Sequence, residues 1–207
     1  MSLFYSIRTV KITTETMKKK EGCTVKKLTI LCDADDTIIS LLPRWLAEIN
    51  RMYGRTVRKE DVHDWDITKA YPGLTADEVL KPLYRAGFWN SVAPVEGSGY
   101  YLERLIKDGH NVWIVTASNL ETSSAKTARL LKLFPFLRQE QILFTQNKQA
   151  VPGDVLIDDG VHNLIGGSYR KILFHQPGNA AFREGKHGIA RVYSWEEAYE
   201  QIKGFVA

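Results

Sequence analysis

The sequence lacks the features that mark secreted, membrane-spanning and repetitive proteins. It has only two cysteines among 207 residues, Cys23 and Cys32, which is far from the cysteine density of a disulfide-stabilised domain. No apolar run approaches the roughly 20 residues that span a bilayer, and the first residues lack the basic and apolar regions of a secretory signal. We therefore expect a cytoplasmic protein with unpaired cysteines and no membrane partner.

A large excess of charge of one sign is also absent. The chain has 28 basic and 24 acidic residues, a net charge of +4, and a hydrophobic content of 44% that is ordinary for a globular protein. The basic excess lies mainly in Lys18-Lys19-Lys20 and Lys26-Lys27, a pattern usual for a solvated tail. Residues 1–25 are expected to form an N-terminal arm or edge strand. A homodimer contact through this arm stays open as an alternative.

Short apolar runs alternate with amphipathic segments over the rest of the chain. The apolar runs predict strands at 27–32, 111–116, 142–144, 155–157, 171–174 and 191–193. Start and stop signals predict helices at 43–54, 75–87, 98–108, 125–134 and from 195 onward. Strands that alternate with helices indicate an α/β fold, a Rossmann-like parallel sheet with helices on both faces.

The segment after the first strand is too long for an ordinary loop. Roughly 60 residues with helix signals and no strong strand separate the first strand from the helix at 98–108. We expect residues 41–94 to form a small helical cap, inserted into a catalytic core made of 26–40 and 95–207. Pro82 lies inside the second cap helix and predicts a kink or a late helix start there.

Polar side chains follow four of the predicted core elements. Asp33 and Asp35 come directly after the first strand, so both carboxylates point toward the crevice at the carboxyl edge of the sheet. The others are Thr116 with Ser118, Lys148, and the pair Asp158-Asp159. Adjacent acids beside a core strand repel each other unless a cation lies between them. Together, in this order, these residues predict a catalytic site for phosphoryl chemistry.

The residue types suggest a division of labour. Asp33 would attack phosphorus, and Asp35 would protonate the leaving alkoxide and then deprotonate water. Mg²⁺ favours hard oxygen ligands, and we assign it to the acids Asp33, Asp35, Asp158 and Asp159, with Asp35 contributing its main-chain carbonyl and Asp158 orienting bound water or the lysine.

Three further residues are expected to hold the phosphate. Thr116, Ser118 and Lys148 would contact the non-bridging phosphate oxygens and offset the charge that develops during transfer.

Aromatic residues in the expected cap supply candidate contacts to a substrate. Trp65, Phe88 and Trp89 could stack on a nucleobase across the cleft between cap and core, because aromatic faces bind bases without strict sequence demands. The alternative is that they form the cap's own small core. The remaining tryptophans are expected in the core: Trp45, Trp113 and Trp195.

This set of motifs resembles the haloacid dehalogenase-like (HAD) superfamily of aspartate-nucleophile phosphatases over about residues 27–205. Within it the chain is similar to the 5'(3')-deoxyribonucleotidases. The shared pieces are Phe88-Trp89, Pro94-Val95-Glu96-Gly97, the lysine loop Phe144-Thr145-Gln146-Asn147-Lys148, Leu156-Ile157-Asp158-Asp159, and Phe174-His175-Gln176-Pro177. The resemblance implies a helical cap, Mg²⁺ and a deoxyribonucleoside monophosphate as substrate.

Three positions depart from the pattern of these nucleotidases. Asp36 stands where glycine is usual, Ala117 where serine is frequent, and Leu41 where an aromatic residue often packs on the base. These departures keep the hydrolase chemistry and leave the base preference open.

Other functions remain as alternatives at this stage. The same core could serve a phosphatase for another small phosphorylated metabolite or for nucleic-acid 3' ends. The cap mixes basic and acidic residues, which favours a small enclosed substrate over a nucleic acid. A phospho-acceptor signalling module is disfavoured, because its acidic pair belongs at the first strand and here the Asp-Asp pair comes late.

Overall fold

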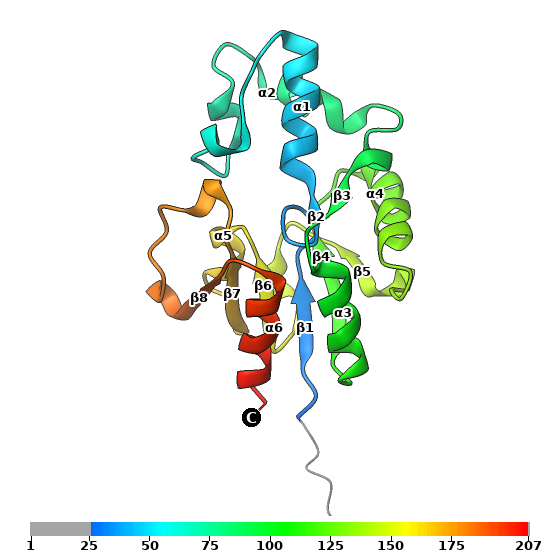
Figure 1. Ribbon diagram of the computed structural model, residues 1–207, viewed down its shortest axis with the longest axis vertical. Coiled ribbons are helices and arrows are strands. Elements are labelled where there is room, and N and C mark those ends of the chain that lie inside the picture. Colours follow the sequence, from blue (N-terminus) through cyan, green and yellow to red (C-terminus); the bar gives the residue numbers. More distant parts are fainter. Residues whose placement is uncertain (1–25, 207) are drawn as a thin grey trace, which may run out of the picture.

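A parallel sheet of six strands forms the centre of the computed structural model, which describes residues 26–206 (Figure 1). The strand order is β5-β4-β1-β6-β7-β8. The strands are β1 (Thr29–Cys32), β4 (Asn111–Thr116), β5 (Ile142–Phe144), β6 (Val155–Asp158), β7 (Arg170–Phe174) and β8 (Ile189–Val192). In register, Cys32 lies opposite Ile114 and Ile157, so the carboxyl ends of the three central strands meet at one edge. The arm predicted at 1–25 lies outside the described residues.

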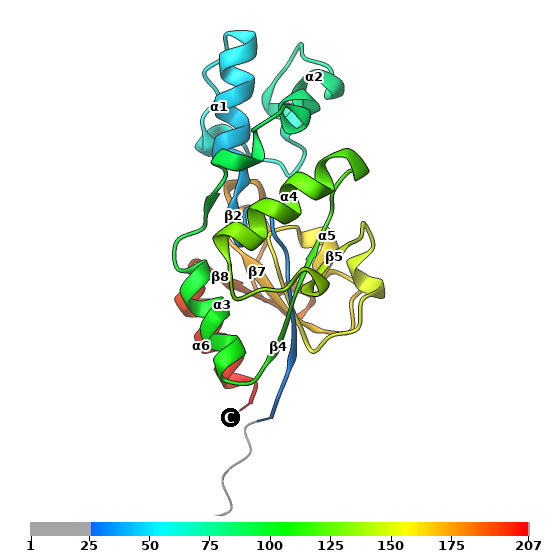
Figure 2. The same cartoon turned by 90° about the vertical axis from the view of Figure 1, so that its right-hand side faces the viewer.

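The two faces of the sheet are buried by different elements. Helices α3 (Ser98–Lys107), α4 (Leu120–Leu133) and α6 (Trp195–Gly204) cover one face, and α3 packs beside α6 (Figure 2). The short helix α5 (Val161–Leu164) and adjoining loops cover the other. Along β1, Ile30 and Cys32 enter the first core and Leu31 the second, as the period of two in a strand requires. The predicted α/β sheet with helices on both faces is therefore confirmed.

Residues between the first strand and α3 form a small layer above the carboxyl edge of the sheet (Figures 1 and 2). It contains α1 (Leu41–Tyr53), α2 (Ala76–Leu80) and several short 3₁₀ turns. Its own apolar core comprises Leu42, Leu46, Ile49, Val62, Ile67, Tyr71 and Val79. A two-stranded ribbon, β2 (Ile39–Ser40) with β3 (Ala93–Pro94), joins this layer to the rest. We call residues 41–94 the cap.

Two helices differ from their predicted bounds for local reasons. The second cap helix ends at Leu80 and continues as a 3₁₀ turn over Lys81–Tyr84, because Pro82 has no N–H to donate to a continuing α-helix. Helix α4 begins at Leu120 rather than near 125. The polar residues of its first turns hid the start, since Ser and Thr are weak helix formers.

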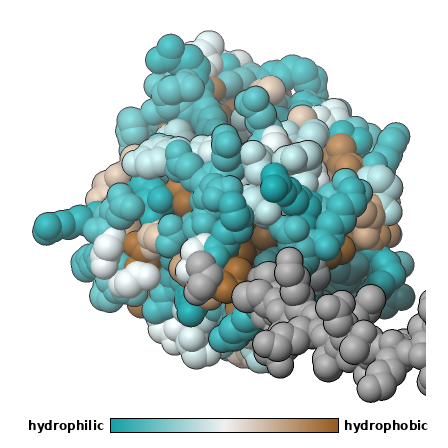
Figure 3. Space-filling model, turned by 60° about the horizontal axis from the view of Figure 1, so that its bottom comes forward, coloured by the Kyte–Doolittle hydropathy of each residue, from teal (hydrophilic) through white to brown (hydrophobic). Residues whose placement is uncertain are grey.

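The surface opposite the cap is mainly hydrophilic, and its apolar side chains form small separate groups (Figure 3). Among residues 26–206, no helix is long and apolar enough to cross a membrane.

Candidate active site

The chain turns sharply where β1 ends. The N–H of Asp33 still pairs with the Ile157 carbonyl of β6 at 2.9 Å, and the Ala34 carbonyl then accepts the N–H groups of Ile38 and Ile39. Asp36 occupies the left-handed region at φ 54°, a conformation that Asp tolerates better than most residues. This turn presents the side chains of Asp33 and Asp35 at the carboxyl edge of the sheet.

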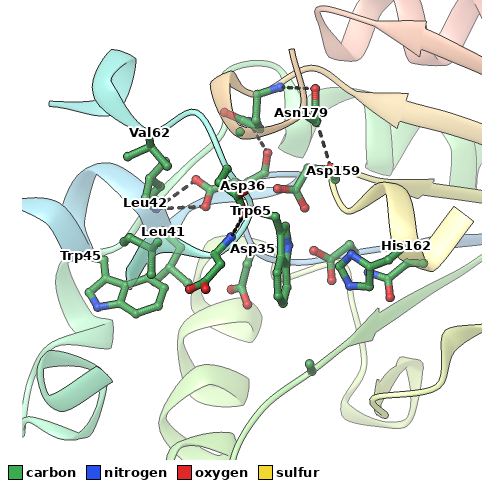
Figure 4. A pocket seen from close by; sticks show the side chains of 18 of the residues that line it. Asp35, Asp36, Leu41, Leu42, Trp45, Val62, Trp65, Asp159, His162 and Asn179 are labelled. Carbon is green, nitrogen blue, oxygen red and sulfur yellow. Dashed lines mark hydrogen bonds between the residues drawn. The ribbon is translucent and has the colours of Figure 1, made fainter. Parts of the chain in front are cut away.

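A cavity of about 380 Å³ lies between this edge and the cap (Figure 4). This volume is within the usual range for small-molecule sites, roughly 300–1,000 Å³. Its two ends differ in chemistry. The end at the sheet is lined by Asp33, Asp35, Lys148, Asp159, Asn163 and Asn179, and the end at the cap by Leu41, Leu42, Trp45, Val62, Ile67 and Leu80.

Three carboxylates and one ammonium group meet at the polar end. Ligand oxygens of Asp33, Asp158 and Asp159 lie within 4.8 Å of one another. The Nζ of Lys148 lies 2.5 Å from Asp33 Oδ1 and 2.6 Å from Asp158 Oδ2, and all three groups are buried. Burial and the charge of Asp33 raise the pKa of Asp158 to about 6. Burial disfavours the ammonium of Lys148, yet the two carboxylates outweigh it and raise the pKa of Lys148 above its ordinary value.

The carboxylates of these acids differ in how many hydrogen bonds they accept from the protein. Asp158 accepts from Lys148, from the N–H of Gly160 at 2.7 Å and from Asn163 at 3.0 Å. The carboxylate of Asp159 accepts no hydrogen bond from the described part of the chain; only its main-chain carbonyl is bonded, to Asn179 at 2.9 Å. Desolvation and the neighbouring acids raise the pKa of Asp159 well above its ordinary value. An acidic cluster with this unused capacity fits a hard divalent cation.

Asp35 has a different partner. Its Oδ2 lies 2.6 Å from the Nζ of Lys126, whereas its Oδ1 is buried and has no partner among the described residues. Burial raises the pKa of Asp35, and Lys126 partly opposes this effect. Lys126 is only 1% exposed. Sequence reasoning missed it, because a lysine in a polar helix is usually solvated. The available signal was its spacing: Thr122, Lys126 and Leu130 are four residues apart, so they share one face of the helix, and all three are buried.

The predicted phosphate ligands lie in different surroundings. Lys148 lines the cavity, as does Ala117, which lies between Thr116 and Ser118 in the chain. Thr116 is fully buried, and its hydroxyl accepts from Lys126 at 2.8 Å. The Ser118 hydroxyl pairs with Thr122 Oγ1 at 2.9 Å at the start of α4. The side chains of Thr116 and Ser118 are therefore not brought to the cavity wall.

The three aromatic candidates separate into two groups. Trp65, 65% exposed, lines the cavity, and its ring lies 4.5 Å from that of His162 (Figure 4). Phe88 and Trp89 are buried, and neither lines this cavity. The indole N–H of Trp89 donates to the Leu83 carbonyl at 3.1 Å. The structure places Phe88 and Trp89 as the packing alternative expects, because both rings belong to the main apolar core.

Several cavity residues were not predicted there, among them Trp45, Asp36 and Gln176. Trp45 was expected in the core, but it is half-buried and lines the cavity while its N–H donates to the Val79 carbonyl at 2.7 Å. Asp36 accepts the N–H of Leu42 with both oxygens, and burial raises its pKa to about 7. Gln176 donates to the Asp36 carbonyl at 2.5 Å. Only the folded chain brings these residues together, from segments up to 140 positions apart.

Comparison with known proteins provides a family context. The sequence pattern of the family "5' nucleotidase, deoxy (Pyrimidine), cytosolic type C protein" matches residues 26–207. A 5'(3')-deoxyribonucleotidase of Bacillus subtilis is 33% identical over 178 residues, which cover 85% of this chain and 99% of the relative. A 5'(3')-deoxyribonucleotidase of Clostridium acetobutylicum is 27% identical over 185 residues, 88% of this chain and 100% of the relative.

The fold has solved counterparts as well. The HAD-hydrolase YfnB of Bacillus subtilis, whose crystal structure is bound to magnesium, superposes with a TM-score of 0.55. It is 17% identical, and the match covers 86% of this chain and 100% of that one. At this level of identity the likeness concerns the fold.

Proposed function

The chain belongs to the 5' nucleotidase, deoxy (Pyrimidine), cytosolic type C family, and from this premise we propose that it hydrolyses deoxyribonucleoside monophosphates through an aspartyl-phosphate on Asp33. The observation that carries the proposal is the contact between Lys148 and Asp33 beside Asp158 and Asp159, at the polar end of the cavity between cap and sheet. The family's cytosolic description supports a cytoplasmic location.

The first step forms a covalent intermediate. One carboxylate oxygen of Asp33 attacks phosphorus while the ester bond to the nucleoside oxygen breaks. Lys148 holds Asp33 Oδ1, so Oδ2 is the oxygen free to attack. The leaving alkoxide takes a proton from Asp35 and departs as the nucleoside. The ammonium of Lys148 offsets the negative charge that develops on the phosphoryl group.

The second step restores the enzyme. The ionised Asp35 removes a proton from water, whose oxygen attacks phosphorus as the bond to Asp33 breaks. Inorganic phosphate leaves, and Asp33 returns as a carboxylate. Mg²⁺, which would be held by the carboxylates of Asp33 and Asp159 and the main-chain carbonyl of Asp35, supplies positive charge against the phosphate oxygens when bound. Asp158, whose oxygens are already bonded within the chain, orients Lys148.

The opposite end of the cavity suits a nucleobase. Its apolar side chains come from the cap, and the exposed ring of Trp65 lines the same cavity. A base that stacks on an aromatic face gains about 1–3 kcal/mol. A volume of about 380 Å³ favours a mononucleotide over an oligonucleotide 3' end.

The deciding experiment is phosphate release with Mg²⁺ from a panel of substrates. The panel contains dUMP, dTMP, their ribonucleotide and 3'-phosphate counterparts, sugar phosphates and a 3'-phosphorylated oligonucleotide, with Asp33→Asn as the inactive control. We expect turnover of the deoxynucleoside monophosphates and a loss of several orders of magnitude in the variant. Release confined to sugar phosphates or to the oligonucleotide would retain the chemistry and reject the substrate class.

A further inference from the structure

Lys126 is a buried cation to which the mechanism above gives no role. It projects from α4, is 1% exposed, and its Nζ contacts three oxygens. These are Asp35 Oδ2 at 2.6 Å, Thr116 Oγ1 at 2.8 Å and the Ala117 carbonyl at 2.9 Å. Burying an ammonium group is costly unless its protons are all bonded, and the three oxygens meet that condition here.

The geometry excludes direct binding of substrate by this lysine. An ammonium group has three N–H donors, and the three oxygens of the chain use all of them. None is left for a phosphate oxygen. Lys148, by contrast, lines the cavity. Lys126 must therefore act through the groups that it holds.

Its effect on Asp35 follows from the two carboxyl oxygens. Lys126 occupies Oδ2 and stops the carboxyl group from rotating, while Oδ1 has no partner among the described residues. The carboxyl group, whose side chain is 29% exposed, is then held in one orientation for exchange of a proton with the leaving group and later with water. Proton transfer needs the donor oxygen within hydrogen-bonding reach in a fixed orientation.

We propose that Lys126 is a positioning residue that fixes the Asp35 carboxyl group for proton transfer to the leaving oxygen and from water. This inference rests on the proposed function. The Lys126 Nζ also lies 5.6 Å from the centre of the Trp89 ring, which covers the ammonium group from that side. The competing role would be through Thr116, as a support for phosphate binding.

The two roles predict different responses to the leaving group. Nitrophenolate leaves without a proton, whereas a nucleoside alkoxide needs one. In single-turnover assays, Lys126→Met is expected to slow nucleoside release from dUMP by on the order of 10²-fold. Nitrophenolate release from p-nitrophenyl phosphate should stay within about threefold of wild type. Because Asp35 also activates water, nitrophenolate should appear as a burst of about one per active site, followed by slow turnover.

Two results would overturn the proposal. Equal losses with both substrates and no burst would assign Lys126 to phosphate binding through Thr116. Unchanged rates with both would make the lysine purely structural. Asp35→Asn should reproduce the burst, and adding Lys126→Met to it should cause no further loss, because both changes act on one group. Additive losses in the double variant would likewise contradict the proposal.

Matched controls separate this role from folding and from the substrate assignment. Lys132→Met, an exposed lysine of the same helix, should keep wild-type rates. If the melting temperature of Lys126→Met falls below the assay temperature, Lys126→Gln takes its place with the same expected split. A wild-type enzyme that hydrolyses an alkyl phosphate but no nucleotide would reject the proposed function. The same comparison, between the alkyl and nitrophenyl esters, would then still decide the role of Lys126.

Discussion

The carboxylate of Asp36 accepts the backbone N–H of Leu42, with its two oxygens at 3.0 and 3.1 Å from the nitrogen. Leu42 lies in the first turn of α1, where backbone N–H groups have no partner within the helix. Asp36 immediately follows Asp35, so one side chain joins the catalytic loop to the cap. The cap and the acid–base residue are thus mechanically linked.

Asp36→Gly should loosen the cap without unfolding the protein. Loss of the contact with Leu42 lowers the free energy of unfolding by about 1 kcal/mol. Glycine adopts the positive φ without strain, which raises it by about 1–2 kcal/mol. We expect the melting temperature to change little and the KM for dUMP to rise several-fold. Asp36→Asn keeps an acceptor and should retain the wild-type KM. Equal KM values for wild type and Asp36→Gly would show that the contact does not position the cap.

Trp65 should contribute to nucleotide binding through its exposed ring. Trp65→Ala removes about 1–3 kcal/mol of stacking, so the KM for dUMP should rise roughly 5- to 150-fold. The kcat should stay within about threefold, since the reacting groups are untouched. Steady-state kinetics on dUMP and on a sugar phosphate measure both effects, and the sugar phosphate should show no KM change. A fall in kcat alone would contradict a base-stacking role.

Trp89 is the matched control for this prediction. Its side chain is buried and bonded to the Leu83 carbonyl, outside the cavity. Trp89→Phe should lower the melting temperature, because it removes that bond and leaves a cavity in the core. The KM for dUMP should not change. A raised KM in a variant of unchanged stability would return Trp89 to the substrate site.

Asp159 should govern the response to Mg²⁺. Its carboxylate has no partner among residues 26–206 and lies beside Asp33 and Asp158. Asp159→Asn therefore removes repulsion, and the variant should melt at a higher temperature than wild type without metal. With Mg²⁺ the order should reverse, because only the wild type gains binding energy, about 2.7 kcal/mol at a hundredfold excess over Kd. Phosphate release should fall by about 10²-fold or more in the variant, and to background when EDTA removes the metal.

Asp154 provides the control for this measurement. It is an exposed acid whose Oδ2 accepts the N–H of Thr29 at 2.7 Å, outside the cluster. Asp154→Asn should keep the wild-type shift of the melting temperature with Mg²⁺. An identical Mg²⁺ shift in Asp159→Asn and wild type would place the cation elsewhere.

His110 should make stability depend on pH, away from the active site. Its Nδ1 accepts the N–H of Leu28 at 3.2 Å, and burial lowers its pKa. The neutral ring is favoured in the folded protein, so its contribution is present above the unfolded pKa of about 6.5 and is lost as the pH falls through the lowered folded pKa. Between pH 7.5 and 5.0 the melting temperature should fall further in wild type than in His110→Asn, which keeps an acceptor and cannot titrate. Parallel curves would contradict this.

Much of the arrangement follows from local patterns. Short apolar runs located the strands, because a parallel strand that is covered on both faces is apolar along its length. Parallel strands bring their carboxyl ends to one edge, and this alone was enough to expect Asp33, Lys148, Asp158 and Asp159 in one place. The bounds of the second cap helix and of α4 were less accurate, since Pro82 and a run of Ser and Thr obscure helix ends.

The sequence by itself determined the order in which the catalytic residues follow the strands, the position of the acidic loop and the family. Tertiary structure decided which side chains reach the cavity. Lys126 is buried, and Phe88 and Trp89 pack in the main core. The exposure of a side chain depends on elements that pack against it from distant parts of the chain. A helix sequence states which residues share a face. Only the packed fold determines which other side chains contact that face.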